Sequence, residues 1–284
     1  MDVITDPIRM QELSLEWKCR EGKVALVPTM GCLHEGHLSL VRLACARAER
    51  VVLSLFVNPA QFGPQEDLDR YPRSVERDLD LCEKEGVSVV FMPEAGSMYA
   101  EDASVSIEEV SLSRGLCGES RPGHFSGVLT VVAKLFLLTQ PDLAVFGEKD
   151  AQQLRLIRRM VRDLNFPVDI VPGPIVREAD GLAMSSRNAN LSPEERAQAT
   201  VLRRSLQAVE SAAAKGERDV EVLRSLVIQQ LAEAPLGTLD YLSFVDDETL
   251  APVERLGQRP VLAAMAVQFP GARLIDNSQL TPPA

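Results

Sequence analysis

Two of the three histidines of this 284-residue chain lie in one short turn near the N-terminus. The turn reads Pro28-Thr-Met-Gly-Cys-Leu-His34-Glu-Gly-His37, between an apolar run at 24–27 and an amphipathic run at 38–44. This order predicts a strand, a glycine-containing turn and a helix. A helix start offers unpaired N–H groups and the positive end of the helix dipole, so phosphate groups bind there. We interpret the turn as a phosphate site in which both imidazoles donate hydrogen bonds to the charge that develops during transfer.

Two other interpretations of this turn stay open at this point: a purely structural turn and a metal site. Zinc usually takes more nitrogen or sulfur ligands, or a pair of histidines in an H-E-x-x-H helix. The spacing of His34 and His37 is one residue shorter than in that motif, and a glycine interrupts it. Cys32, inside the turn, is interpreted as a small neutral side chain, because a nucleophilic thiol needs a nearby base and a lowered pKa.

A second polar cluster, Gly147-Glu148-Lys149-Asp150, lies between an apolar run and an amphipathic run. A lysine that follows a glycine turn can meet phosphate as a point charge. The alternative is a solvated loop, since lysine and aspartate are usually exposed.

A third cluster, Met184-Ser185-Ser186-Arg187-Asn188, places two hydroxyls and a guanidinium in a loop. Such a loop could clamp phosphates, close over a nucleotide and exclude water. A polar linker between domains is the alternative interpretation.

Two further turns carry neutral or basic recognition groups. Asn58 and Gln61 lie in an Asn-Pro turn after an apolar run, and amides can bind hydroxyls and carboxylates without net charge. Arg121 lies in a glycine-containing turn before a helix, where it can orient an anion or pair with an acidic neighbour. An ordinary turn is the alternative for the amide pair.

Composition limits the function classes. The formal net charge of −11 and pI near 4.9 argue against a general nucleic-acid binder, which normally carries a basic face. ATP binding stays possible because local basic groups and Mg²⁺ supply positive charge. We expect no membrane span, because no apolar run reaches about 18 residues, and no signal peptide, because the start lacks basic and apolar regions. Five scattered cysteines without a C-x-x-C pair indicate a cytoplasmic protein.

The order of apolar and amphipathic runs predicts an α/β protein in two domains. Buried strands are expected at 24–28, 51–57, 87–92, 143–146 and 168–171, with helices at 8–19, 36–48, 74–85, 127–139 and 151–165. Apolar strands between amphipathic helices imply a parallel sheet, in which ligands bind beyond the carboxyl ends of the strands. All three turns that hold the histidines, the amides and Lys149 follow such strand ends.

Residues 1–176 are expected to form this first domain, and residues 177–284 a smaller α+β domain. Ser192 followed by Pro193 predicts a helix start. Helical sequence then runs to residue 214 and again over 220–233, and strands that look antiparallel are expected at 239–245, 261–267 and 273–276. The last residues, 281–284, are expected to be frayed.

Taken in order, the motifs closely resemble one family, the pantoate–β-alanine ligases (pantothenate synthetases). The motifs are P-T-M-G-x-L-H-x-G-H, F-V-N-P-x-Q-F, R-P-G-H-F-x-G-V, F-G-E-K-D-x-Q-Q and R-E-x-D-G-L-A-M-S-S-R-N, between Val24 and Arg196. The histidine turn is also similar to H-I-G-H of class I aminoacyl-tRNA synthetases and related nucleotidyltransferases, and 184–187 to their mobile K-M-S-K-S loop. The amide turn and the G-E-K-D-x-Q-Q helix make the resemblance specific.

The resemblance implies a Rossmann-like parallel sheet with helices on both faces and a two-step reaction. The carboxylate of (R)-pantoate attacks the α-phosphorus of ATP, which gives pantoyl adenylate and pyrophosphate. The amine of β-alanine then attacks the acyl carbon, which gives pantothenate and AMP. The product places the enzyme in pantothenate and coenzyme A biosynthesis. An acyl phosphate hydrolyses readily, so a closing loop suits this chemistry.

The resemblance also implies roles for individual residues. His37 matches the family's proton donor, His34 donates to phosphate oxygens, and Asp150 binds ribose hydroxyls. Catalytic residues are expected to be His34, His37, Lys149, Ser185, Ser186 and Arg187. ATP is expected to contact Met30, Gly31, Cys32, Leu33, His34, Glu35, Gly36, His37, Gly147, Glu148, Lys149, Asp150, Val176, Met184, Ser185, Ser186 and Arg187. Gln61 and Gln153 are expected to bind pantoate, with Asn58 and Arg121 as secondary candidates for pantoate or β-alanine.

The family is typically a cytoplasmic homodimer that acts on small molecules. Mg²⁺ is expected to arrive with ATP, and the protein ligands of the metal are unknown from the sequence, with Asp78 as one candidate. Cys32 occupies a variable position of the turn, which predicts that thiol reagents block the site.

Two other functions remain as alternatives. An adenylyltransferase of the same superfamily with a nucleotide monophosphate as acceptor would need basic groups where Asn58, Gln61 and Gln153 stand. A nucleotide-binding module without activity would lack the histidines, the lysine and the serine–arginine loop, all of which are present. A tRNA synthetase is disfavoured by the net charge and by the lack of an anticodon-binding module.

Overall fold

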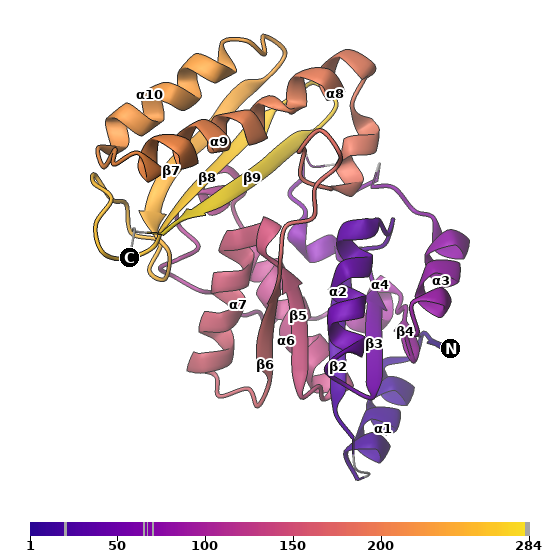
Figure 1. Ribbon diagram of the computed structural model, residues 1–284. Coiled ribbons are helices and arrows are strands. Elements are labelled where there is room, and N and C mark those ends of the chain that lie inside the picture. The colour runs from indigo at the N-terminus through magenta and orange to yellow at the C-terminus, as the bar shows by residue number, and fades with distance from the viewer. Residues whose placement is uncertain (20–21, 65, 67, 70, 282–284) are drawn as a thin grey trace. The chain divides into compact units, whose positions relative to one another are not determined.

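The computed structural model describes residues 1–19, 22–64, 66, 68–69 and 71–281, and the chain forms two compact units (Figure 1). Unit 1 consists of 1–110, 121–148 and 153–174, and unit 2 consists of 111–120, 149–152 and the chain from Ile175 onward. The fraying expected over 281–284 concerns, apart from Thr281, residues that lie outside the described part of the chain.

Unit 1 contains a six-stranded parallel sheet in the order β1-β4-β3-β2-β5-β6. The strands are β1 (Asp2–Ile4), β2 (Val24–Thr29), β3 (Arg50–Leu55), β4 (Val89–Phe91), β5 (Leu143–Gly147) and β6 (Asp169–Gly173). The predicted parallel sheet is therefore confirmed, and β1 is an additional short strand that the sequence pattern did not indicate. After β2 the chain builds β3 and β4 on one side and then crosses to build β5 and β6 on the other.

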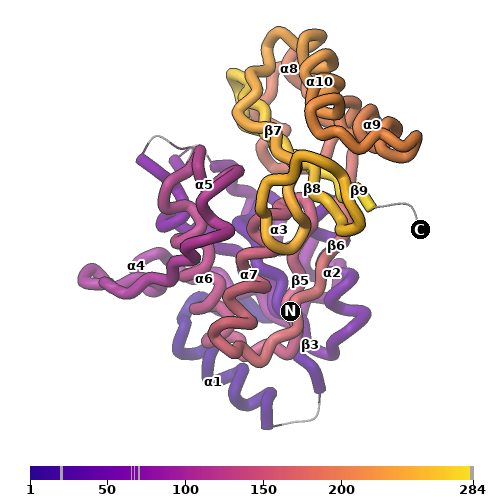
Figure 2. Tube along the Cα trace, turned by 90° about the vertical axis from the view of Figure 1, so that its left-hand side faces the viewer, coloured from indigo at the N-terminus to yellow at the C-terminus, as the bar shows by residue number. Residues whose placement is uncertain are grey.

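Helices cover both faces of this sheet. They are α1 (Pro7–Lys18), α2 (Glu35–Cys45), η1 (Pro59–Gln61), α3 (Val75–Lys84), α4 (Ala95–Met98), α6 (His124–Thr139) and α7 (Ala151–Asp163), whose first two residues belong to unit 2. Figures 1 and 2 show α2 on one face of the strands, and α1 and α6 on the opposite face. Alternate strand residues such as Ala25, Val27, Leu53 and Val145 pack with Val41 of α2, so burial on both faces fixes the register.

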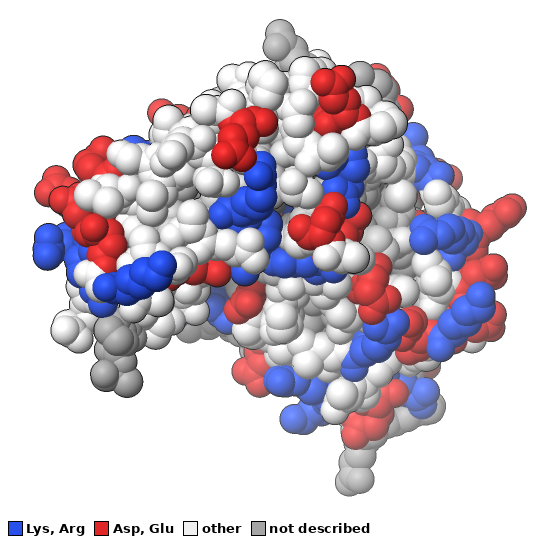
Figure 3. All heavy atoms as spheres, turned by 45° about the horizontal axis from the view of Figure 1, so that its top comes forward, with Lys and Arg blue, Asp and Glu red and all other residues white. Residues whose placement is uncertain are grey.

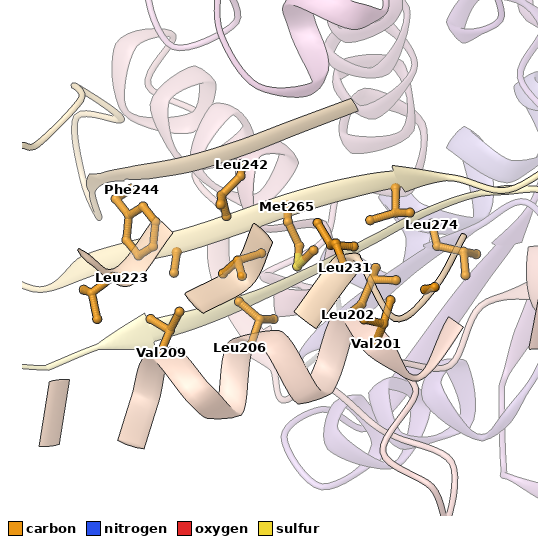
Figure 4. Packing of buried hydrophobic residues seen from close by; sticks show 14 of the residues in the cluster. Val201, Leu202, Leu206, Val209, Leu223, Leu231, Leu242, Phe244, Met265 and Leu274 are labelled. Carbon is orange, nitrogen blue, oxygen red and sulfur yellow. The ribbon is translucent and has the colours of Figure 1, made fainter. Parts of the chain in front are cut away.

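Unit 2 contains a three-stranded antiparallel sheet, β7-β8-β9, as the sequence predicts. Its elements are α5 (Cys117–Ser120), η3 (Ser186–Asn190), α8 (Pro193–Ala199), α9 (Val201–Ala214), α10 (Val220–Leu231), β7 (Thr238–Asp246), β8 (Val261–Gln268) and β9 (Arg273–Leu280), and η2 (Glu148–Asp150) lies at its boundary with unit 1. Figure 4 shows Leu206 of α9, Leu223 of α10, Phe244 of β7 and Met265 of β8 in one apolar core.

The start of α8 is formed as expected from Ser192. The Ser192 hydroxyl accepts from the N–H of Glu195 at 3.2 Å, and the Glu195 carboxylate accepts from the N–H of Ser192 at 2.6 Å. This reciprocal capping box satisfies two N–H groups that a helix start otherwise leaves without partners.

Acidic and basic side chains are interspersed on the face drawn in Figure 3. Such a mixed surface differs from the basic stripe typical of nucleic-acid binders. Among the described helices, none is both long and apolar enough to span a membrane.

Candidate active site

Three predicted turns follow neighbouring strands of the unit 1 sheet. Strand β2 pairs with β3 on one side and with β5 on the other. The histidine turn follows β2, the amide turn follows β3, and the Gly147–Glu148 segment lies at the end of β5. The order in which the strands are added to the sheet reverses at β2. The carboxyl ends of these three strands therefore form the switch point at which α/β sheets bind ligands.

The histidine turn leaves β2 through two left-handed residues. Gly31 has φ 85° and Cys32 has φ 51°, and the chain then enters α2 with His34 at the N-cap. The imidazole rings of His34 and His37 lie 4.0 Å apart between centroids. Nδ1 of His37 accepts from the backbone N–H of His34 at 3.4 Å, so a neutral His37 carries its hydrogen on Nε2. Both histidines therefore lie at a helix N-terminus, as predicted.

Asp78 of α3 holds the backbone of this turn. Its carboxylate is fully buried and accepts from the N–H groups of Cys32 at 2.7 Å and Leu33 at 2.8 Å. Arg77, the preceding residue, donates to the carbonyl of Leu33 at 2.9 Å. Both oxygens of Asp78 are thus used by the backbone, which disfavours the suggested role as a magnesium ligand. Across the described part of the chain, no cluster of three histidine, cysteine or acidic side chains suits a metal ion.

The thiol of Cys32 is electrostatically disfavoured from ionising. Burial and the negative charge of Asp78 raise the pKa of Cys32 above its ordinary value. The thiol therefore stays protonated at neutral pH, which supports the interpretation of Cys32 as a neutral side chain rather than a nucleophile.

Glu35, in the first turn of α2, forms an ion pair with Arg42, which also binds Glu85 beyond the end of α3. The hydrogen bond from Arg42 lowers the pKa of Glu35. Glu35 is one of the predicted ATP contacts, and in the structure its side chain is directed along the helix surface toward Arg42.

The amide turn is buried and closely packed. Asn58 is 1% exposed and Gln61 is 9% exposed, and both belong to the turn around η1. The N-terminal part of α6 presses against it, because a Cβ added at Gly127 would lie 2.1 Å from the carbonyl oxygen of Ala60. Gly127 therefore permits the close approach that holds the amide pair in place.

Arg121 is engaged by an acidic neighbour, one of the two possibilities that the sequence left open. Its guanidinium binds both carboxylate oxygens of Glu66, at 2.7 and 2.5 Å. Burial raises the pKa of Glu66, but the hydrogen bonds and charge of Arg121 outweigh burial and lower it. Arg121 also contacts Nε2 of His124 at 2.9 Å, and Nδ1 of His124 lies 2.8 Å from the carbonyl oxygen of Gln61. Arg121 thus supports the backbone of the amide turn through its contact with His124.

The boundary between the two units falls inside the G-E-K-D motif. Gly147 and Glu148 belong to unit 1, whereas Lys149 and Asp150 belong to unit 2. Lys149 Nζ lies 3.8 Å from Asp150, and the Lys149 carbonyl accepts from Asn277 of β9 at 3.0 Å. Within unit 2, the described contacts therefore fix the backbone of Lys149 to the C-terminal sheet.

Gln152 is a residue to which the motif analysis gave no role, although it stands in the G-E-K-D-x-Q-Q motif beside the predicted pantoate contact Gln153. Its carbonyl oxygen accepts from the N–H of Cys117 at 3.0 Å, and its amide nitrogen donates to the carbonyls of Leu112 and Gly115. Gln152 thus fixes the 111–120 segment in unit 2. Gln153 itself lies in unit 1, in the first turn of α7 after β5.

The predicted phosphate clamp follows a tightly bonded hairpin in unit 2. The backbone N–H of Met184 donates to the carbonyl of Val176 at 3.0 Å. Both residues are predicted to line the nucleotide with their backbone, and this bond joins them. Arg177 binds Asp276 of β9 at 2.7 and 3.0 Å, and the Asp276 side chain is fully buried. The Ser185 hydroxyl caps η3 by accepting from the N–H of Arg187 at 3.3 Å.

Two acidic side chains of the same hairpin, Glu178 and Asp180, bind residues that follow the hairpin in the sequence. Glu178 accepts from Asn188 at 2.7 Å and from Arg196 at 2.6 Å, and Arg196 also binds Asp180 at 2.7 Å. The hydrogen bond from Arg196 lowers the pKa of Asp180. The segment that carries Ser185, Ser186 and Arg187 is therefore anchored at both ends within unit 2.

The structure thus distributes the predicted site over both units. Unit 1 brings the histidine turn, the amide turn, Gly147, Glu148 and Gln153 to one edge of the sheet. Unit 2 carries Lys149, Asp150, Val176 and residues 184–187. The roles assigned to individual residues stay predictions.

Together, the fold and the arrangement of the turns are those of a nucleotide-binding type of α/β protein, with two histidines at the start of a helix that follows a central strand. The family model described as pantoate-beta-alanine ligase matches residues 2–279. The chain belongs to the pantoate–β-alanine ligase family. It is a ligase that condenses pantoate with β-alanine, the step that forms pantothenate.

Individual relatives match over their full length. The pantothenate synthetase of Thermotoga petrophila is 52% identical over 280 residues, which cover 99% of this chain and 100% of the relative. A crystal structure of the enzyme from Thermus thermophilus has a TM-score of 0.94 at 46% identity, covering 99% and 100% of the two chains. The Francisella tularensis pantoate–β-alanine ligase, complexed with β-γ ATP and β-alanine, has a TM-score of 0.80 at 30% identity, covering 98% and 97%. The family, fold class and ligase activity predicted from the sequence are confirmed.

Proposed function

We propose that this ligase activates pantoate with ATP. A carboxylate oxygen of (R)-pantoate attacks the α-phosphorus, the bond to the β-phosphate oxygen breaks, and pyrophosphate leaves. The amine of β-alanine then attacks the acyl carbon of pantoyl adenylate, expels AMP and loses a proton, which gives pantothenate. The single observation that carries this proposal is the placement of a histidine-bearing helix start beside a buried amide turn at the switch point of one sheet. The relative complexed with β-γ ATP and β-alanine supports ATP and β-alanine as two of these substrates.

The histidine turn stabilises the transferring phosphate in this proposal. The α-phosphoryl transition state needs positive charge and positioning more than covalent help. His37 donates from Nε2, because its Nδ1 is occupied by the backbone N–H of His34. His34 donates to a second phosphate oxygen, and the start of α2 adds its dipole.

Unit 2 supplies the remaining phosphate contacts. Lys149 and the Ser185–Arg187 segment hold phosphates, and Asp150 binds ribose hydroxyls. The backbone at Met30, Gly147, Val176 and Met184 lines the nucleotide, and Gln61 and Gln153 bind the carboxylate and hydroxyls of pantoate. Residues 1–176 then act as the nucleotide- and pantoate-binding domain, and 177–284 as a smaller lid domain.

Mg²⁺ enters this scheme as part of its ATP complex. The described residues do not form a cluster of metal ligands, and the two oxygens of Asp78 already bind backbone N–H groups. We therefore assign the metal to the phosphate oxygens of ATP. We also propose a cytoplasmic homodimer, as is typical of the family.

Pantoate-dependent exchange of labelled pyrophosphate into ATP, without β-alanine, tests the proposal. Exchange requires reversible formation of an adenylate, so we expect it with D-pantoate and not without. His37→Ala should lower the exchange rate by about two orders of magnitude, as for loss of a preorganised charge stabiliser. Folded protein that binds ATP but gives no exchange with pantoate would reject the adenylate route.

The pantoate contacts are tested by binding rather than by rate. Gln61→Ala and Gln153→Ala should weaken pantoate binding much more than ATP binding, measured by titration calorimetry. Equal losses for both ligands would indicate a misplaced site or a damaged fold.

A further inference from the structure

The side chain of Asn58 uses all four of its hydrogen-bonding positions inside unit 1. Its oxygen accepts from the N–H of Ala60 at 3.3 Å and from the hydroxyl of Tyr99 at 2.9 Å. Its nitrogen donates to the carbonyl of Gly127 at 3.1 Å and to the side-chain oxygen of Gln61 at 3.2 Å. An amide that is 1% exposed and fully paired in this way has one orientation.

Two backbone groups fix which end of the Asn58 amide faces which partner. The N–H of Ala60 can only donate, and the carbonyl of Gly127 can only accept. A flipped amide would set donor against donor and acceptor against acceptor in a buried site, which is costly. The Asn58 nitrogen therefore faces Gln61, and the atom of Gln61 that meets it must be the carbonyl oxygen.

The orientation of Gln61 follows from that of Asn58. With its oxygen turned toward Asn58, Gln61 presents its amide nitrogen, which lies 3.0 Å from the thioether sulfur of Met30. A thioether is a weak acceptor, so a ligand oxygen can replace it at little cost. Met30 belongs to the histidine turn, so the amide nitrogen of Gln61 points toward that turn.

We propose that Tyr99 is a positioning residue that holds Asn58, and through it Gln61, in place, so that Gln61 donates a hydrogen bond to a pantoate oxygen. This inference rests on the proposed function, in which Gln61 binds pantoate. It adds the polarity of that contact: Gln61 donates its amide N–H to an acceptor such as a pantoate carboxylate oxygen.

The surroundings of Tyr99 support a fixed donor. Burial raises the pKa of Tyr99 to about 12, so its hydroxyl keeps its proton at physiological pH. The ammonium group of Lys134 on α6 lies 5.7 Å from the centre of the Tyr99 ring, which holds the ring against that helix. Without the Tyr99 hydroxyl, the oxygen of Asn58 would keep only the longer contact to Ala60.

Tyr99→Phe tests the proposal, with Tyr241→Phe as the matched control. Tyr241→Phe also removes one hydroxyl contact, in this case the one to the Cys117 sulfur at 3.3 Å. Tyr241 lies on β7 in unit 2, away from the amide turn in the chain. We expect Tyr99→Phe to raise the KM for pantoate about five- to tenfold, as for loss of one buried hydrogen bond, with kcat and the KM for ATP nearly unchanged and the thermal midpoint lowered by only a few degrees. Tyr241→Phe should leave the KM for pantoate unchanged. An unchanged KM for pantoate in Tyr99→Phe would overturn the proposal.

A double-mutant cycle separates positioning from a structural role. If Tyr99 acts through Gln61, then Tyr99→Phe should have no further effect on pantoate binding in a Gln61→Ala background. Effects that multiply would overturn the proposal. Pantoate binding that is unaffected by Gln61→Ala alone would instead refute the pantoate contact of the proposed function.

The polarity of the contact has its own test. Gln61→Glu keeps the oxygen that faces Asn58 but replaces the donor by a second acceptor. We expect it to bind pantoate more weakly than Gln61→Ala, because two acceptors then face each other. Binding as tight as that of the unmodified enzyme would show that Gln61 accepts from pantoate, and would overturn the inference.

Discussion

Asp78 is the residue on which the geometry of the histidine turn depends most, so Asp78→Asn is the most informative perturbation. The carboxylate is fully buried and accepts two backbone N–H groups, from Cys32 and Leu33. Asparagine keeps one acceptor oxygen but turns an NH₂ group toward the other N–H. The variant therefore loses one hydrogen bond to a charged group and gains a donor–donor contact.

The size of the effect follows from these contacts. A hydrogen bond to a charged group contributes about 1.5–3 kcal/mol, and an unpaired buried donor costs a similar amount. We expect the free energy of unfolding to fall by about 3–6 kcal/mol. Because a misplacement of about 1 Å costs about 100-fold in rate, we expect kcat to fall by about 10- to 100-fold.

The pKa of Cys32 provides a readout that a general loss of stability would not move. The charge of Asp78 helps to raise that pKa. Removing the charge should lower it, so the thiolate fraction at mildly alkaline pH should increase. Alkylation of Cys32 by iodoacetamide, followed by peptide mass spectrometry across a pH series, should then reach its half-maximal rate at a lower pH.

The matched control is Asp80→Asn, because Asp80 lies two residues further along α3 and is exposed. It removes the same charge from the same helix, and we expect neither activity nor the Cys32 profile to change. The reasoning would be refuted if Asp78→Asn kept full activity and an unchanged pH profile for Cys32.

Three further perturbations follow from close contacts. Gly127→Ala would place a Cβ 2.1 Å from the Ala60 oxygen, so the amide turn must move, and the KM for pantoate should rise by at least about tenfold in steady-state assays. Asp276→Asn leaves the partly buried Arg177 without its carboxylate and should lower stability by about 2–3 kcal/mol in calorimetry, with weaker ATP binding. Ser192→Ala removes a helix cap and should cost about 1 kcal/mol of stability without changing kcat; a loss of activity would contradict it.

Much of the fold could be predicted because each element carries a local signal. Apolar strands alternate with amphipathic helices, so the parallel sheet follows from periodicity alone. The predicted strand at 51–57 ends at Leu55, since the chain then turns toward Asn58. Helix α6 begins at His124 rather than at Gly127, because the left-handed Gly123 is its N-cap. Strand β1 spans only three residues, too few for a recognisable pattern.

The residues that could do chemistry were also visible as local motifs, whereas those that position them were not. Asp78 lies 46 residues from Cys32, Tyr99 lies 41 from Asn58, and Asp276 lies 99 from Arg177. No pattern within one element reports contacts at such separations. A weak signal existed for Asp78, an acid four residues before the buried Cys82 on the same helical face.

The transfer of oxygen from pantoate to AMP tests the central claim most directly. Pantoate with a heavy oxygen isotope in its carboxylate is converted with ATP and β-alanine in a single turnover, and the products are analysed by mass spectrometry. Attack of the carboxylate on the α-phosphorus predicts that AMP carries one heavy oxygen atom, because the acyl–oxygen bond breaks when β-alanine attacks. Unlabelled AMP, with the heavy oxygen in pyrophosphate or phosphate, would contradict the acyl adenylate and the role assigned to the histidine turn.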